Sequence, residues 1–170
     1  MKFEICGPFE IPRGNKGVIT DVKQFWKELA EEWGEGLVKA HGAYVFAIKS
    51  ARGTKPWYVG KAGKTFKQEA LNAENIKKYN GKLDTVTRGK PWLFLLPELN
   101  DGGGFSRKTE SAHTKALELM LIERALAANP NLLNSSNTKL LREIEVFGFI
   151  NSRKPGKPSE AVQEFKKCFS

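Results

Sequence analysis

The sequence predicts an α+β fold in which helices flank a small three-stranded antiparallel sheet. Strand-forming apolar residues are concentrated in three short runs, at 43–48, 57–60 and 91–96. Segments with apolar residues at helical spacing lie before, between and after these runs, and glycine- or proline-containing turns separate them. The resulting order is helix, two strands, helix, strand and helix, followed by a tail. A chain of 170 residues fits one domain, so we treat 1–170 as a single domain.

The N-terminal part begins without a periodic pattern. Residues 1–19 contain several prolines and glycines, which predict an irregular or short-strand segment. The first helix is expected over 21–33, because its apolar residues recur on one face and Gly34 follows it.

The central part contains the predicted sheet. The run 43–48 is apolar throughout, which is typical of a strand covered on both faces. A turn at 50–54 joins it to the strand at 57–60, so these two strands form an antiparallel hairpin. A helix is expected over 65–79, before the third strand at 91–96.

The C-terminal part contains the strongest helical pattern, over 110–128. This helix is apolar on almost every side, which predicts that it is deeply packed. It ends at Asn129, because a residue before proline is driven out of the helical region. Beyond it we expect a helical turn, a strand at 144–150, a basic loop at 153–158 and a last helix at 159–168.

The charge balance indicates the class of partner. The chain has 28 Lys and Arg against 19 Asp and Glu, a net charge of +9, which favours polyanions such as nucleic acids. No apolar run is long enough to span a membrane, so no membrane partner is expected. Cys6 and Cys168 lie at opposite ends and the N-terminus has no signal pattern, which favours a reduced, cytoplasmic setting.

Two tyrosine motifs lie on the predicted hairpin. Gly42-Ala43-Tyr44 is followed, fourteen residues after its tyrosine, by Tyr58-Val59-Gly60. Further on, Glu118 lies in the long helix, and a Pro-x-x-x-Asn segment after that helix ends at Asn134. In its order and spacing this pattern resembles the GIY-YIG endonuclease family, whose domain opens with two tyrosine-bearing strands.

The resemblance implies a fold, an activity and a cofactor. It implies a GIY-YIG-like nuclease core at about 40–136, with an N-terminal helical extension at 1–39 and a basic C-terminal extension at 137–170. It implies a metal-dependent endonuclease that hydrolyses DNA phosphodiester bonds, with Glu118 as the ligand of one Mg²⁺ or Mn²⁺ ion. A stand-alone domain of this kind is similar to small restriction enzymes and mobile-element nucleases.

The chemistry explains why tyrosines and a carboxylate belong together. Phosphodiester hydrolysis needs an activated water and a counter-charge for the transition state. A tyrosine takes a proton from water only when nearby cations lower its pKa from about 10. We expect Tyr58 to be the base or the water-positioning group and Tyr44 to be the supporting hydroxyl, although the roles could be exchanged. Taken singly, each tyrosine is better explained as a core residue whose hydroxyl reaches the surface. Their occurrence on adjacent strands of one hairpin, each in a motif with glycine, favours a functional role.

Two further site residues have alternative interpretations. Helical periodicity does not separate Glu118 from Glu123, and only the resemblance selects Glu118 as the metal ligand, which leaves Glu123 as an ion-pair member. Asn134 is assigned to the site by the resemblance, with a structural or catalytic role. Its alternative is a turn-capping role with Ser135.

The cations depart from the family pattern. The family carries an arginine about ten residues after the second tyrosine, and that position is Gln68 here. Lys67 is the first substitute and Arg88 the second, although lysine lacks the bidentate fork of arginine. Contacts to backbone phosphates are expected from a wider basic set: Lys61, Lys64, Lys67, Lys77, Lys78 and Arg88.

The expected partner is therefore DNA, with RNA and a homodimer left open. Two other functions compete with the nuclease. One is a catalytically silent nucleic-acid-binding module on the same fold, which the missing arginine favours. The other is a protein-interaction subunit in which the charge is incidental.

Overall fold

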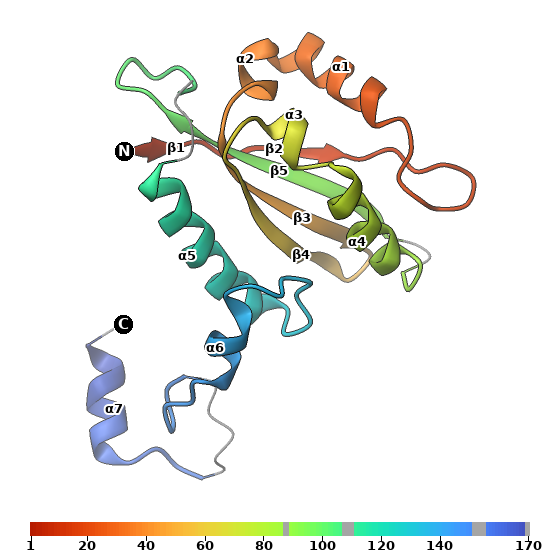
Figure 1. Ribbon diagram of the computed structural model, residues 1–170. Helices are drawn as coiled ribbons and strands as arrows, with labels where there is room; N and C mark the ends of the chain where they lie inside the picture. Colours follow the sequence, from red (N-terminus) through yellow and green to blue (C-terminus); the bar gives the residue numbers. More distant parts are fainter. Residues whose placement is uncertain (87–88, 107–110, 151–155, 169–170) are drawn as a thin grey trace. The chain divides into compact units, whose positions relative to one another are not determined.

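The computed structural model describes residues 1–86, 89–106, 111–150 and 156–168. Contacts within the chain divide it into two compact units, Met1–Asn134 and Ser135–Ser170. Figure 1 shows the elements of each unit along the chain. No helix within the described residues is both long and apolar enough to cross a membrane.

The first unit is built on an antiparallel sheet, so the α+β class is confirmed. Among the described residues this sheet has five strands, in the order β1-β5-β3-β4, with β2 also paired to β5. The strands are β1 (Lys2–Phe3), β2 (Cys6–Glu10), β3 (Gly42–Ser50), β4 (Gly53–Ala62) and β5 (Lys90–Leu99).

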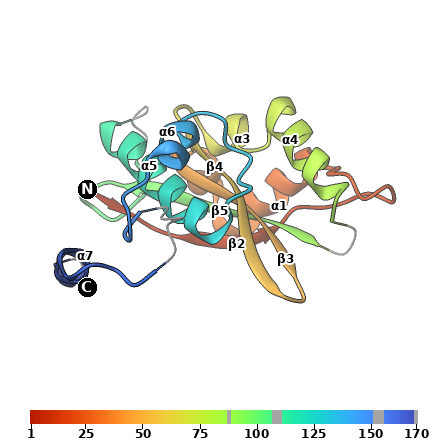
Figure 2. The same ribbon diagram turned by 90° about the horizontal axis from the view of Figure 1, so that it is seen from below.

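The predicted sheet was too small. Its three strands correspond to β3, β4 and β5, and two N-terminal strands add to the outer side of β5. These strands are short, and Gly7 and Pro8 interrupt β2, so the alternation that identifies a strand is absent. The turn of the β3–β4 hairpin, at Ala51 and Arg52, is exposed and projects from the unit (Figure 2).

Helices of the first unit occupy most of the predicted positions. They are α1 (Val22–Trp33), α2 (Glu35–Val38), α3 (Phe66–Glu69), α4 (Ala73–Leu83) and α5 (Ala112–Ala128). The single helix predicted over 65–79 is two helices. The break arises because the Asn72 side chain accepts a hydrogen bond from the backbone N–H of Asn75 at 2.9 Å, which caps a new helix.

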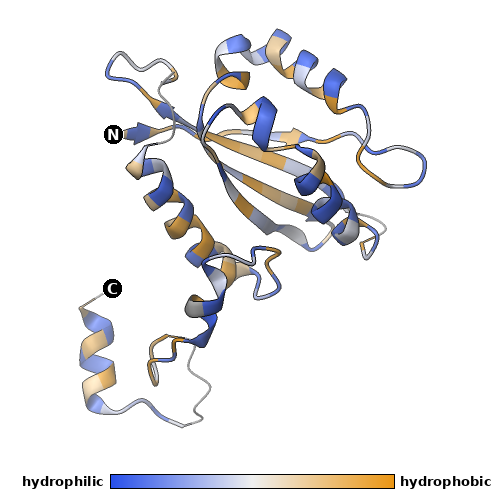
Figure 3. Ribbon diagram, in the orientation of Figure 1, coloured by the Kyte–Doolittle hydropathy of each residue, from blue (hydrophilic) through white to orange (hydrophobic). Residues whose placement is uncertain are grey.

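The core lies on one face of the sheet. Alternate residues of β3 and β5, among them Phe46 and Leu93, are fully buried there with apolar residues of α1 to α4. Figure 3 shows that hydrophobic residues are concentrated along the central strands. α5 packs mainly against β4. The prediction that α5 is deeply packed is wrong, since Leu119 and Met120 are 45% and 56% exposed and only one side of the helix, including Ile122, is buried.

The second unit contains α6 (Thr138–Glu143) and α7 (Glu160–Lys167). The predicted strand at 144–150 is wrong. Only an isolated bridge joins Val146 to Ile150, because Gly148, with φ of 76°, turns the chain back on itself. The predicted basic loop lies partly outside the described residues.

Candidate active site

The structure brings the two motif tyrosines together on the core face of the hairpin. Tyr44 on β3 lies opposite Gly60, and Tyr58 on β4 lies opposite Phe46. Their ring centroids are 6.2 Å apart. Tyr44 is only 3% exposed, whereas Tyr58 is half-buried, so Tyr58 is the one that solvent reaches more easily.

Packing explains the glycine in each motif. A Cβ atom on Gly60 would lie 2.4 Å from Cζ of Tyr44, so only glycine leaves room for that ring. A Cβ atom on Gly42 would lie 2.1 Å from the carbonyl oxygen of Leu96, and its φ of 153° also disfavours other residues. The glycines therefore allow the tyrosine ring and the neighbouring strand to approach closely.

A β-bulge redirects the second tyrosine motif. The pairing shifts from Phe46 opposite Tyr58 to Ala47 opposite Pro56, which leaves Trp57 as the additional residue. Neighbouring strand residues normally point to opposite faces, but Trp57 and Tyr58 both contact the core side. Bulges recur beside active sites because they re-aim side chains in this way.

α4 supplies residues that the motif analysis did not select for the site. The Tyr79 ring stacks on Phe46 at 4.0 Å and lies 5.7 Å from Tyr58. The Asn75 amide, which is buried, donates a hydrogen bond of 2.9 Å to the Tyr44 hydroxyl. In the sequence, Asn75 and Tyr79 are marked only by their spacing of four residues, which places them on the same side of a helix.

Burial is the largest influence on the pKa of both tyrosines. Burial raises the pKa of Tyr44 far above its usual value. Burial also raises the pKa of Tyr58, while the ammonium of Lys78 and a hydrogen bond with Tyr44 lower it. Because the effect of burial is larger, additional positive charge is needed before Tyr58 can act as a base.

Glu118 acts on the same pair of hydroxyls. Its negative charge raises the pKa of both Tyr44 and Tyr58, so its carboxylate lies within electrostatic range of both. Glu118 is half-buried, whereas the competing Glu123 is exposed. No group of three or more His, Cys, Asp or Glu side chains within the described residues could hold a metal ion by itself. One carboxylate beside tyrosine oxygens fits Mg²⁺, which keeps several waters and binds through few carboxylates together with substrate phosphates.

A buried carboxylate anchors the helix that carries Glu118. Glu98 on β5 is 1% exposed and accepts hydrogen bonds from Ser111, the N-cap of α5, and from Thr114 at 3.1 Å. Nε2 of His41 lies 3.4 Å from the same carboxylate. Burial raises the pKa of Glu98, but these hydrogen bonds outweigh it and hold the pKa below its usual value. Thr114 precedes Glu118 by four residues on the same helix side, so this anchor sets where Glu118 lies.

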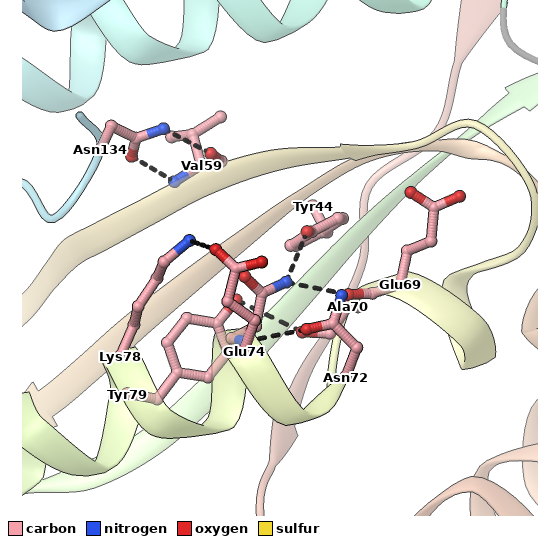
Figure 4. A network of polar contacts seen from close by, with 10 residues as sticks. Tyr44, Val59, Glu69, Ala70, Asn72, Glu74, Lys78, Tyr79 and Asn134 are labelled. Atoms are coloured by element: carbon pink, nitrogen blue, oxygen red, sulfur yellow. Dashed lines mark hydrogen bonds and ion pairs between the residues drawn. The ribbon is translucent and has the colours of Figure 1, made fainter. Parts of the chain in front are cut away.

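Asn134 is bonded to the strand that carries Tyr58. Its amide accepts a hydrogen bond from the Val59 N–H at 2.9 Å and donates one to the Val59 carbonyl at 2.6 Å (Figure 4). Asn129 donates to the Pro56 carbonyl at 2.7 Å, and the Leu133 N–H donates to the Trp57 carbonyl at 2.8 Å. Residues 129–134 thus cover the outer edge of β4, and the two Asn134 hydrogen bonds help to position that strand.

The predicted cations divide between two places. Lys67 on α3 is exposed. After the ion pair with Lys39, it contributes to the lowered pKa of Glu35 on α2, and it is not among the groups that shift the pKa of the tyrosines. Lys78 on α4 instead has its ammonium 5.3 Å from the Tyr58 ring centroid. The other expected phosphate contacts are a half-buried Lys61, an exposed Lys64, an exposed Lys77, and Arg88, which lies outside the described residues.

No protein-family model, curated protein or solved structure matches this chain.

The positioning role of Asn134 predicts a loss of stability on substitution. Asn134→Ala removes both hydrogen bonds to Val59 and leaves a buried N–H and C=O without partners, which should cost about 2 kcal/mol of unfolding free energy. Urea denaturation measures this change. Asn131→Ala, at an exposed position of the same segment, is the control and should have little effect. Full stability in Asn134→Ala with lost activity would instead indicate a direct catalytic role.

Proposed function

We propose that this protein is a metal-dependent endonuclease of the GIY-YIG type that hydrolyses DNA phosphodiester bonds. The observation that carries the proposal is the convergence of Tyr44, Tyr58 and Glu118 from β3, β4 and α5. Two hydroxyls and one carboxylate within electrostatic range of one another are suited to water activation and to holding a hard cation. The net charge of +9 supports a polyanionic substrate.

The polar groups around Tyr58 oppose the effect of burial. The Tyr44 hydroxyl oxygen accepts a hydrogen bond from the Asn75 amide at 2.9 Å, and the Lys78 ammonium and Tyr44 both lower the pKa of Tyr58. This arrangement favours the negatively charged form of Tyr58. Deprotonated Tyr58 accepts a proton from water while the water oxygen attacks phosphorus. The bond from phosphorus to the leaving sugar oxygen breaks, and that oxygen takes a proton from solvent.

Glu118 is the residue that would hold a divalent cation. When bound, Mg²⁺ or Mn²⁺ supplies positive charge that polarises the phosphate and favours ionisation of Tyr58. Glu98 and Ser111 contribute indirectly, because they hold the first turn of α5 against β5.

Lys78 is the best-placed cation for the charge that develops on the phosphate. Its ammonium lies beside Tyr58, and Glu74, which is exposed, holds it through an ion pair of 2.7 Å. We assign to Lys78 the role that the sequence motifs predicted for Lys67 or Arg88. Lys78 supplies a point charge, and it cannot make the bidentate contact that an arginine would make.

Supercoiled plasmid incubated with and without Mg²⁺ or Mn²⁺ tests the proposal, since metal-dependent nicking is expected. Lys78→Ala should lower the nicking rate by about 10²-fold, the loss typical of one group that stabilises transition-state charge. Lys67→Ala is the matched control on the neighbouring helix and should change the rate little. A large loss in Lys67→Ala and none in Lys78→Ala would restore the assignment from the sequence.

A silent nucleic-acid-binding module is the second candidate. Two observations favour it: Gln68 stands where the family has arginine, and burial raises the pKa of both site tyrosines. DNA binding without any metal-dependent nicking by the wild type would support this candidate.

A further inference from the structure

Trp57 and Lys82 form a contact beside the tyrosine site that the proposed hydrolysis does not use. The Lys82 ammonium lies 3.7 Å from the centroid of the Trp57 indole ring. Trp57 is the additional residue of the bulge, so it stands next to Tyr58 on the same side of β4. Lys82 follows Lys78 by four residues on α4, which places the two ammonium groups over neighbouring aromatic rings.

No carboxylate among the residues that the structure describes compensates the charge of Lys82. Within the described part of the chain Lys82 makes no ion pair, whereas Lys78 pairs with Glu74. A contact with an indole face leaves the ammonium cationic and able to donate hydrogen bonds to an anion. Lys82 and Trp57 are both half-buried, so the contact is partly accessible.

The bulge holds this pair in place before any ligand binds. The Trp57 carbonyl accepts a hydrogen bond from the Leu133 N–H at 2.8 Å, and the adjacent Pro56 carbonyl accepts one from Asn129 at 2.7 Å. The backbone of the bulge is thus bonded to residues 129–134 on its outer side. A surface ordered in advance loses less conformational entropy on binding.

We propose that Trp57 and Lys82 bind one strand of a nucleic acid next to the position of hydrolysis, with Lys82 on a backbone phosphate and Trp57 against the adjoining base. The choice of a nucleic acid as partner rests on the proposed function. Aromatic rings stack on bases of any sequence, and lysines neutralise the backbone, so this surface contributes affinity and strand position without selecting a sequence.

Fluorescence anisotropy of a labelled single-stranded DNA, in EDTA and at a series of salt concentrations, tests the surface without cleavage. Lys82→Gln should weaken binding and lower the slope of log K against log salt by about one unit. Trp57→Leu should weaken binding about tenfold and leave the slope unchanged. Circular dichroism confirms that each variant is folded, and Lys82→Gln at the helix surface remains informative if Trp57→Leu fails to fold.

The chain offers a matched control in a second lysine–tryptophan contact. Lys49 lies 5.6 Å from the ring centroid of Trp92, and the strand register places this pair on the opposite face of the sheet. Lys49→Gln should therefore leave affinity and salt slope close to those of the wild type.

The outcomes separate this surface from the proposed function. Binding that depends on Lys82 in a protein that never nicks DNA supports the surface and overturns only the nuclease. Metal-dependent nicking by the wild type, with Lys82→Gln binding like Lys49→Gln, overturns the surface and leaves the nuclease. A wild type that binds no DNA in EDTA overturns the surface as well.

Discussion

Glu118→Gln is expected to reduce metal-dependent nicking by roughly 10³-fold while DNA binding at low salt remains close to that of the wild type. The amide is close in size to the carboxylate but has no negative charge, so it binds a divalent cation poorly. Plasmid nicking measures the rate, and fluorescence anisotropy of a labelled DNA measures the binding.

Glu123→Gln is the control for this result. Glu123 lies five residues further along the same helix and is exposed, and the groups that shift the pKa of the two tyrosines do not include it. Its substitution should change neither rate nor binding. Unchanged nicking in Glu118→Gln would contradict the assignment of the metal ligand, and equal losses in both variants would point to an effect on the whole helix.

Tyr58→Phe is expected to lower the nicking rate by about 10²- to 10⁴-fold, the usual contribution of a group that transfers a proton. The ring keeps its contacts with Tyr44 at 6.2 Å and Tyr79 at 5.7 Å, so the unfolding free energy should change by less than about 1 kcal/mol. Because burial raises the pKa of Tyr58, the wild-type rate should increase as the pH rises toward that pKa. The variant should lack this increase.

Tyr79→Phe separates catalysis from packing. The Tyr79 hydroxyl is buried and donates to the Ala70 carbonyl at 3.3 Å, so its loss should cost about 1 kcal/mol of stability and leave the rate unchanged. The nicking rate of Tyr44→Phe should lie between the rates of Tyr58→Phe and Tyr79→Phe, since this substitution removes the acceptor of the Asn75 hydrogen bond. A folded Tyr58→Phe protein that nicks DNA normally would show that Tyr58 is only a core residue.

The strands and helices that carry the site could be predicted from local patterns. The apolar run of β3 and the breaks around it identify a buried strand by themselves, and the helical spacing of α1 is equally direct. The short N-terminal strands could not be predicted, since a strand of two residues has no period. They exist because β5 offers them an edge with which to pair.

The site was less predictable than the fold. The motif order selected Tyr44, Tyr58 and Glu118, and the structure places these three within electrostatic range of one another. The bulge at Trp57 depends on the register between two strands, which composition does not reveal. The number of residues after Tyr58 favoured Lys67 as the cation of the site. In the structure the packing of α4 brings Lys78 to Tyr58 instead, which composition does not reveal either.

The position of β4 at the end of the sheet has a consequence for the temperature range of activity. Among the described strands β4 pairs with β3 alone, and hydrogen bonds from residues 129–134 cover its other side. Segments held in this way open locally at a lower free-energy cost than a central strand such as β3. Tyr58 would lose its alignment when residues 129–134 detach, with the rest of the sheet still intact. Heating should therefore inactivate the protein reversibly some degrees below the temperature at which it unfolds.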